Sequence, residues 1–269
     1  MSFNLTIDQG NTAAKLALWT RTPDSQCVDV RISREHTADA IARLCNEVDV
    51  ETAIYASVTT PHSPVLCMLR QRCRKVIELK PGTPIPLRID YATPNTLGVD
   101  RIAAAVGAWS LPQAHGRDIL VVDIGTAITY DMVTADARYI GGNIAPGVYM
   151  RLRALNRFTA RLPMVDPEEG PIPLLGNNTE TALRSGAVNG VVAEIEYYRS
   201  HLSSDATAVI TGGSAHQISE RLSFEHTVVD GLVSQGLNNI IRYNESLHTP
   251  SGPTAAGKST QTLNNPIKI

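Results

Sequence analysis

The first residues of the chain alternate between apolar and polar side chains, as a half-buried strand does. Every second position within residues 3–8 is apolar, and a period of two indicates a strand with one buried face. A second β-like run, residues 13–19, follows after a short turn. We therefore predict that the chain opens with a β-hairpin.

Strand-like and helical patterns then alternate up to residue 112. The expected strands cover residues 28–33, 52–58 and 76–79, and the expected helices cover 38–48, a segment after Pro61 and a segment from Asp100. Proline suits the first turn of a helix but cannot continue one, so Pro112 should end the third helix. Residues 81–94 are rich in proline and are predicted to be a loop.

The second half of the chain repeats the same order. The expected strands cover residues 118–123, 127–133, 138–144, 206–211 and 226–229, and the expected helices cover a segment after Pro146, 179–202, 215–222 and 231–243. Residues 161–177 contain four prolines and should form a loop. Two openings by strands, each followed by α/β alternation, predict an α/β protein of two lobes with a cleft between them.

This repeat also suggests where the lobes meet. We expect an N-terminal lobe over residues 1–115 and a C-terminal lobe over residues 116–246. Residues 247–269 are rich in Thr, Ser, Asn, Gly and Pro, a composition typical of a flexible tail.

Composition and charge exclude several classes of protein. The net charge of −2 gives no electrostatic footprint for a nucleic-acid partner. The sequence contains no run of about 18 apolar residues, so we expect no membrane span. The N-terminus does not resemble a signal peptide. The four cysteines form no CxxC pair and no zinc-like spacing, so we expect reduced thiols in a cytoplasmic protein.

A short turn of a carboxylate and a glycine occurs twice, each time after a predicted strand. Asp8 opens residues 8–12 (DQGNT), and Asp123 opens residues 123–129 (DIGTAIT). Glycine lets the backbone approach a ligand closely, and the following amides and Thr hydroxyls can donate to phosphate oxygens. The carboxylates would hold a cation beside the phosphates. One such turn is usually ordinary, but two of them predict two similar lobes that grip one nucleotide.

Two further segments add to this site. Residues 211–214 (TGGS) lie between a strand and a helix, where glycines can let a base or ribose lie against the backbone. Asp100 opens a predicted helix, so it is either an N-cap or a general base that accepts a hydroxyl proton. Arg101 is then either an exposed helix residue or a ligand-binding residue whose guanidinium group binds a carboxylate or phosphate through two parallel hydrogen bonds. The local sequence leaves both alternatives open.

Taken together and in order, these motifs resemble those of type III pantothenate kinases, members of the acetate kinase, sugar kinase, Hsp70 and actin superfamily. The motifs that carry the resemblance are residues 8–12, 98–101, 123–129 and 141–147. The resemblance extends from Asp8 to about Arg242. It implies two ribonuclease H-like (actin-like ATPase) lobes with a nucleotide cleft between them. It also implies a homodimer with the substrate site near the subunit interface.

The implied reaction is ATP-dependent phosphorylation of pantothenate to 4'-phosphopantothenate, the first step of coenzyme A biosynthesis. By this resemblance Asp100 is the general base. The ATP-binding residues would be Asp8, Gln9, Gly10, Asn11, Thr12, Ala13, Ala14, Lys15 and Thr126. The pantothenate-binding residues would be Tyr91, Gly98, Val99, Asp100, Arg101 and Thr179. Thr181 is the alternative to Thr179, and Lys15 is alternatively a solvated strand residue.

The resemblance also implies two cations. Asp123 would bind a monovalent cation, K⁺ or NH₄⁺, and Asp8 would hold Mg²⁺ through water. Two other hypotheses stay open at this point: a sugar or acid kinase of the same superfamily, and a non-catalytic regulatory accessory protein of the same fold. Residues 252–259 also match the P-loop pattern. We reject the P-loop because no strand precedes it and too few residues follow it.

Overall fold

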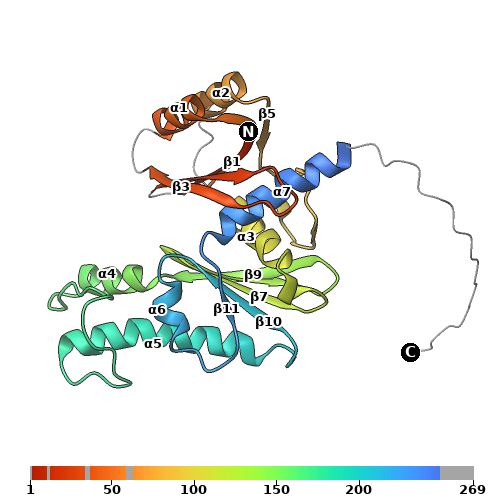
Figure 1. Ribbon diagram of the computed structural model, residues 1–269. Coiled ribbons are helices and arrows are strands. Elements are labelled where there is room, and N and C mark those ends of the chain that lie inside the picture. Colours follow the sequence, from red (N-terminus) through yellow and green to blue (C-terminus); the bar gives the residue numbers. More distant parts are fainter. Residues whose placement is uncertain (1, 11–12, 34–36, 59–62, 249–269) are drawn as a thin grey trace, which may run out of the picture.

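The protein consists of two lobes, each built on a mixed β-sheet, with two helices between them (Figure 1). The computed structural model describes residues 2–10, 13–33, 37–58 and 63–248. Asn11, Thr12 and the segment 249–269, which includes the rejected P-loop pattern, lie outside the described residues. Among the described residues, no helix combines the length and the apolarity needed to cross a membrane.

The first sheet has the strand order β3-β2-β1-β4-β5. Its strands are β1 (Ser2–Gln9), β2 (Ala14–Thr20), β3 (Cys27–Ser33), β4 (Asp49–Ser57) and β5 (Lys75–Glu78). The predicted N-terminal hairpin is confirmed, since β1 and β2 pair in antiparallel register. Helices α1 (Thr37–Glu47) and α2 (Ser63–Arg72) pack against β4. The apolar side chains that alternate along β1 and β2 form the core beneath these helices.

The second sheet has the strand order β11-β10-β7-β8-β9-β6. Its strands are β6 (Arg88–Ile89), β7 (Ile119–Ile124), β8 (Ala127–Val133), β9 (Arg138–Pro146), β10 (Thr207–Thr211) and β11 (Thr227–Val228). The antiparallel pair of β7 and β8 repeats the hairpin of the first lobe. Helices α4 (Val148–Phe158), α5 (Thr179–Ser200) and α6 (Ala215–Ser219) lie together on one side of this sheet (Figure 1).

One strand was missed by the sequence pattern. Strand β6 lies inside the segment 81–94 that we predicted to be a loop, and it pairs in parallel with β9. Two residues are too few to leave a periodic signal, and the pairing partner lies far along the chain. A part of the predicted lobe 1–115 thus completes the second sheet, and the boundary at 115/116 stays a prediction.

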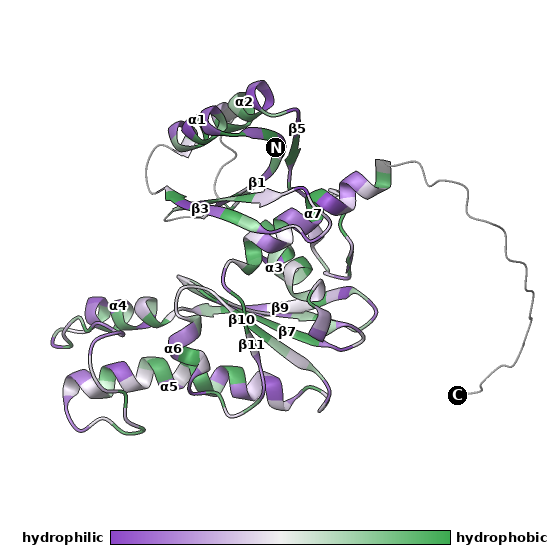
Figure 2. Ribbon diagram, in the orientation of Figure 1, coloured by the Kyte–Doolittle hydropathy of each residue, from purple (hydrophilic) through white to green (hydrophobic). Residues whose placement is uncertain are grey.

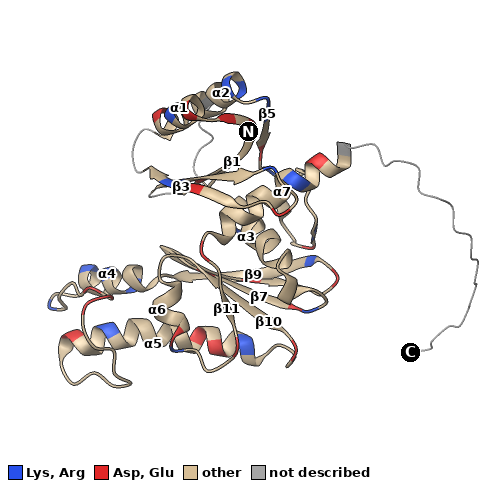
Figure 3. Ribbon diagram, in the orientation of Figure 1, with Lys and Arg blue, Asp and Glu red and all other residues tan. Residues whose placement is uncertain are grey.

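Helices α3 (Val99–Trp109) and α7 (Leu232–His248) cross between the two sheets. Helix α7 also contacts β1 and β4, so the C-terminal end of the described chain returns to the first lobe. Helix α3 is largely hydrophobic (Figure 2), and its charges are confined to its first turn (Figure 3). A helix that is apolar on all sides is typical of the inside of a core. Most residues of α3 are indeed buried. The crossing joins the two lobes into one hydrophobic unit.

The crossing of α3 and α7 depends on two glycines. A Cβ on Gly236 would collide with the carbonyl oxygen of Ala103 and lie 2.9 Å from the amide nitrogen of Gly107. A Cβ on Gly107 would lie 2.6 Å from the carbonyl oxygen of Leu232. Backbone atoms cannot move aside as a flexible side chain does, so the helices touch only because both residues lack side chains.

We expect Gly236→Ala to lower the free energy of unfolding by about 1–3 kcal/mol, because the added methyl group overpacks the crossing. Gly186→Ala is the matched control, since it is also a helical glycine and a Cβ there meets nothing within 4 Å. The control should raise stability by up to about 1 kcal/mol, the difference in helix propensity. Urea denaturation of both variants measures this, and equal effects would contradict the close contact.

Candidate active site

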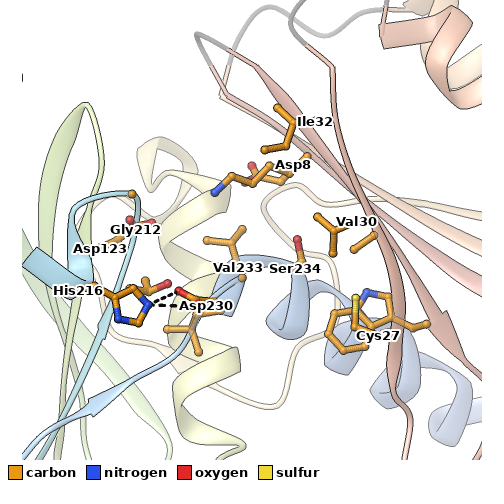
Figure 4. A pocket seen from close by; sticks show the side chains of 17 residues that line it. Asp8, Cys27, Val30, Ile32, Asp123, Gly212, His216, Asp230, Val233 and Ser234 are labelled. Atoms are coloured by element: carbon orange, nitrogen blue, oxygen red, sulfur yellow. Dashed lines mark hydrogen bonds and ion pairs between the residues drawn. The ribbon is translucent and has the colours of Figure 1, made fainter.

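A cavity of about 410 Å³ lies between the lobes, and both carboxylate-glycine turns contribute to it (Figure 4). From the first lobe it is lined by Asp8, Lys15, Ala17, Trp19, Cys27, Val30 and Ile32. From the second lobe and the start of α7 it is lined by Asp123, Thr211, Gly212, Gly213, His216 and residues 230–234. The predicted cleft between two similar lobes is therefore present in the described structure.

Asp8, Lys15 and Asp123 line the same cavity, and each has a defined place in its own sheet. Lys15 stands opposite Asp8 in the β1–β2 pair, and Asp123 stands opposite Thr211 in the β7–β10 pair. Lys15 lines the cavity and is also an exposed residue of β2, so it is accessible both to a ligand and to solvent. Its ammonium group lowers the pKa of both carboxyls.

Burial nevertheless dominates the titration of the two carboxyls. It raises the pKa of Asp8 to about 6, with Lys15 opposing the shift and the charges of Asp100 and Asp123 adding to it. It raises the pKa of Asp123 to about 6 as well, opposed by Lys15 and supported by Asp100 and Asp131. Several carboxylates therefore share a region to which the described residues contribute Lys15, and an added cation would relieve their repulsion.

The glycine pair after β10 lies directly beside Asp123. Gly212 has a φ of +99°, and a Cβ there would lie 2.5 Å from Oδ1 of Asp123. Both facts require glycine at this position. The predicted third element of the site thus lines the same cavity as the two Asp turns.

Asp100 lies in the first turn of α3, and its charge reaches both Asp8 and Asp123. Its prediction as an N-cap is wrong, because the N-cap is Gly98 and the helix begins at Val99. Oδ1 of Asp100 accepts a hydrogen bond from the backbone amide of Arg101 at 2.8 Å. A Cβ on Gly98 would lie 2.5 Å from this oxygen, so the glycine leaves room for the carboxylate.

Arg101 is a buried residue, and the prediction of an exposed helix position is wrong. Its side chain is 6% exposed, and its Nε and Nη2 donate to Oδ1 of Asp131 at 3.0 and 2.6 Å. The ring of Tyr91 lies 5.9 Å from the Arg101 guanidinium carbon and meets the ring of Tyr139 edge-on. Tyr91, Asp100 and Arg101, which we predicted to contact the substrate, thus belong to one neighbourhood around the start of α3.

The remaining predicted residues lie elsewhere or in turns. The Gly10 amide donates to the carbonyl oxygen of Ala13 at 3.0 Å, which closes the first turn between Gln9 and Ala14. Thr126 is exposed in the second turn, where its carbonyl oxygen accepts from the Gly147 amide. Neither Gly10 nor Thr126 lines the cavity among the described residues.

Thr179 is the exposed first residue of α5 and does not line the cavity of its own chain. Its alternative, Thr181, is occupied with capping this helix. The Thr181 amide donates to Asn178 Oδ1 at 3.0 Å, and its Oγ1 accepts from the Asn178 amide at 3.2 Å. Thr181 is also buried. These contacts favour Thr179 as the residue free to meet a ligand.

Sequence reasoning missed several residues of the cavity. Val30 and Ile32 are apolar, exposed and on the edge strand β3, and they form one wall. His216 lies 3.2 Å from Asp230 on the opposite wall (Figure 4). The exposed apolar residues of β3 carried no usable signal, because their alternation is that of any half-buried strand. Asp131, which does not line the cavity but pairs with Arg101, did carry a signal, since a charged residue stands inside the apolar run of β8.

Among the described residues, no group of three or more His, Cys, Asp or Glu side chains is arranged to hold a metal ion by itself. The carboxylates of the cavity still fit a cation that takes its other ligands from water and phosphate. Magnesium in nucleotide sites is usually bound in this way, through one or two carboxylates.

Two lobes with matching hairpins, two Asp turns facing one cavity and a crossing helix pair define the chain as an actin-like ATPase fold with a nucleotide cleft. A family model described as type III pantothenate kinase matches residues 4–201. The chain belongs to the type III pantothenate kinase family.

Relatives bearing that name match along almost the whole chain. The protein from Phocaeicola vulgatus is 40% identical over 91% of this chain and 100% of its own. The protein from Porphyromonas gingivalis W83 is 36% identical over 91% of this chain and 100% of its own. The family that the sequence resemblance indicated is confirmed.

Solved structures share the fold at lower identity. A Campylobacter jejuni protein described as a Baf family transcriptional activator has a TM-score of 0.57 and 21% identity, covering 90% of this chain and 99% of that one. A glucokinase from an Antarctic psychrotroph has a TM-score of 0.51 and 12% identity, covering 90% and 99%. At these identities the likeness shows the fold alone, so the description of the Campylobacter protein as a transcriptional activator is not transferred to this chain.

Proposed function

We propose that this protein transfers the γ-phosphoryl group of ATP to the terminal hydroxyl of pantothenate, with Asp100 as the general base. The observation that carries the proposal is that Asp8, Lys15 and Asp123 line one cavity and that the charge of Asp100 reaches both of these carboxyls. Phosphoryl transfer needs positioning and charge neutralisation more than covalent chemistry. A cavity with excess carboxylates and a glycine-lined wall is suited to ATP with its cations.

The nucleotide would lie in the cavity between the lobes. Gly212 and Gly213 would let the ribose or base approach the backbone, and Val30 and Ile32 supply an apolar wall for it. Lys15 would neutralise phosphate oxygens. The turn 8–15 would donate backbone amides to the phosphates, with Thr126 in the equivalent turn of the second lobe.

Asp8 would hold Mg²⁺ through water, and Asp123 would hold K⁺ or NH₄⁺. These ions supply positive charge that neutralises the phosphate oxygens during transfer. Burial is the main cause of the raised pKa of both carboxyls, and neighbouring carboxylates add to it, so a cation bound beside them would favour their ionised form.

Pantothenate would bind around the start of α3. The residues that we propose to contact it are Tyr91, Gly98, Val99, Asp100 and Arg101, with Thr179. Asp100 orients the hydroxyl and takes its proton as the phosphoryl group transfers. Arg101 would pair with the carboxylate of pantothenate, because guanidinium matches carboxylate geometry.

The test is to incubate the protein with pantothenate, ATP and Mg²⁺, with and without K⁺ or NH₄⁺, and to measure phosphopantothenate by mass spectrometry. We expect turnover that depends on the monovalent cation. Turnover of a sugar or acid but not of pantothenate would favour another kinase of the superfamily. Binding of both substrates without turnover would favour the regulatory alternative.

We also propose a homodimer formed through the protruding end of the second lobe (Figure 1). Large apolar side chains are exposed there on α4 and on the segment 161–177: Tyr149, Met150, Leu155, Phe158, Met164, Leu174 and Leu175. Phe158 and Leu174 are 81% and 86% exposed. Exposed apolar patches of this kind mark protein interfaces, and Thr179 lies next to this one in the sequence.

Replacing both Phe158 and Leu174 with Glu is expected to give a monomer, because buried charges oppose association. Since Thr179 begins the neighbouring helix, we also expect a higher KM for pantothenate. Light scattering after size exclusion measures the mass. Val28→Glu is the control, being an exposed apolar residue of the first lobe. A dimer that survives the double change would contradict this interface.

A cytoplasmic location is part of the same proposal. All four cysteines, Cys27, Cys45, Cys67 and Cys73, are unpaired, which suits a reducing compartment.

A further inference from the structure

A buried carboxylate stands behind Arg101 and has no role in the site as described so far. Asp131 lies in the middle of β8 with 0% exposure, although its neighbours in the strand are mostly apolar. Its Oδ1 accepts from Nε and Nη2 of Arg101 and from the hydroxyl of Tyr139 at 2.6 Å. Its Oδ2 has no hydrogen-bond partner among the described residues.

The geometry of this pair fixes one edge of the guanidinium. Nε and Nη2 both donate to the same oxygen, so the edge of the group that carries them stays turned toward Asp131. Nη1 is the nitrogen that Asp131 does not engage. The rings of Tyr91 and Tyr139, 5.9 and 6.0 Å from the guanidinium carbon, border the group as well.

The backbone of β9 is shaped around the same pair. A Cβ on Gly142 would lie 2.8 Å from Arg101 Nη2 and would collide with Asp131 Oδ1. Such a Cβ would also collide with the carbonyl oxygen of Tyr130, so glycine at this position accommodates both the neighbouring strand and the ion pair. An ion pair at the surface needs no such space in the backbone. Burial of a carboxylate with one oxygen that accepts no hydrogen bond costs free energy of folding. A cost of this kind is typical of a functional site, where an arrangement is kept for positioning.

We propose that Asp131 is a positioning residue that holds Arg101 in the orientation required to pair with the carboxylate of the substrate. The proposal rests on the proposed role of Arg101 in binding pantothenate. Asp131 itself does not touch the substrate. Tyr139 supports it by donating to the same oxygen, and Gly142 provides the space.

The structure offers a matched control on the opposite face of β8. Tyr130, the residue before Asp131, donates to Glu194 at 2.7 Å, and Arg151 pairs with the same oxygen at 2.6 Å. Successive strand residues point to opposite faces, so this second cluster has the same chemistry but lies among α4 and α5. Glu194→Gln thus damages an Arg–carboxylate–Tyr cluster without affecting Arg101.

The experiment compares Asp131→Asn, Glu194→Gln and the unchanged enzyme on two substrates. One is pantothenate, and the other is the neutral analogue in which its carboxylate is reduced to an alcohol. In Asp131→Asn we expect the KM for pantothenate to rise by about 10-fold to 100-fold, as loss of an orienting partner does elsewhere. We expect kcat and the KM for ATP to change by less than about 3-fold, because only ground-state binding is weakened.

The analogue separates positioning from a general loss of structure. The unchanged enzyme should prefer pantothenate over the alcohol, and Asp131→Asn should lose most of that preference, whereas Glu194→Gln should keep it. If Asp131→Asn gives too little folded protein, Tyr139→Phe tests the proposal, since it keeps both charges and removes one bond to Oδ1. It should reduce the preference in the same direction by a smaller factor.

Each outcome has one meaning. If the unchanged enzyme does not distinguish the two substrates, then Arg101 does not recognise the carboxylate, and the proposed roles of Arg101 and of Asp131 both fail, while phosphorylation of pantothenate itself stands. If it does distinguish them and the Asp131 and Tyr139 variants do so equally well, only the role of Asp131 is overturned. If the Glu194 variant loses the preference as well, the effect is structural and the role of Asp131 is again overturned.

Discussion

Asp100→Asn is expected to lower kcat for pantothenate phosphorylation by about 1,000-fold, within the range for loss of a general base. Asparagine has the same shape, but its amide cannot take the hydroxyl proton. The KM for pantothenate should change by less than about 3-fold, since the proton moves only as the phosphoryl group transfers. Steady-state kinetics and calorimetric binding of pantothenate measure the two effects separately.

The matched control is Asp118→Asn, a carboxylate just before β7 whose Oδ1 accepts from the Ala135 amide. It lies at the opposite end of the strand from Asp123 and should leave kcat unchanged. The charge of Asp100 also raises the pKa of Asp8 and Asp123, so the pH profile of the Asp100 variant should shift to lower pH. Retention of more than a tenth of the activity would contradict its assignment as the base.

Asp123→Asn is expected to abolish stimulation by K⁺ or NH₄⁺ and to reduce kcat/KM for ATP by about 100-fold, since several kcal/mol of charge stabilisation are lost with the cation. The measurement is a titration of each cation against activity at fixed ATP and Mg²⁺. The Asp118→Asn protein again serves as the control. A variant that responds to K⁺ as the unchanged enzyme does would show that the cation binds elsewhere.

The same change should stabilise the protein when no ligand is bound. The pKa of Asp123 is raised from 3.8 to about 6 in the folded protein, so the folded state binds the proton more tightly than the unfolded chain. The stability that this proton gives is complete below pH 3.8 and is lost as the pH rises through about 6. Ionised Asp123 therefore opposes folding at pH 8, and asparagine removes this opposition.

We expect Asp123→Asn to raise the free energy of unfolding at pH 8 by about 1–2 kcal/mol, a value reduced from the full linkage because the side chain is partly solvated. At pH 4 the gain should be close to zero. Urea denaturation at both pH values measures it. A gain of equal size at pH 4 would contradict the titration of Asp123 as its cause.

Much of the local structure followed from the sequence. Alternation in β1 and the apolar run before Asp123 predicted both hairpins, and Asp with Gly at the end of each strand predicted two turns at a cleft between the lobes. Pro112 marked the end of α3 correctly, because a proline cannot continue a helix. These predictions held because each depends on residues within a few positions of one another.

The pairs that build the site were beyond such reasoning. Arg101 and Asp131 form an ion pair although they are 30 positions apart in the sequence. No local pattern indicates which carboxylate a buried arginine pairs with. The wall formed by Val30 and Ile32 faces His216 only because α7 and α3 hold the lobes at that distance. Strand β6 exists only through its pairing with β9.

The sequence by itself therefore determined most of the elements, the two Asp-Gly turns and, through the order of its motifs, the family. Only the tertiary structure decided that Arg101 is buried, that Asp131 and Tyr139 hold it, and that Gly107 and Gly236 allow α3 and α7 to touch. The physical reason is range: backbone periodicity and turn chemistry act between neighbours, whereas ion pairing and packing act between residues that only the folded chain brings together.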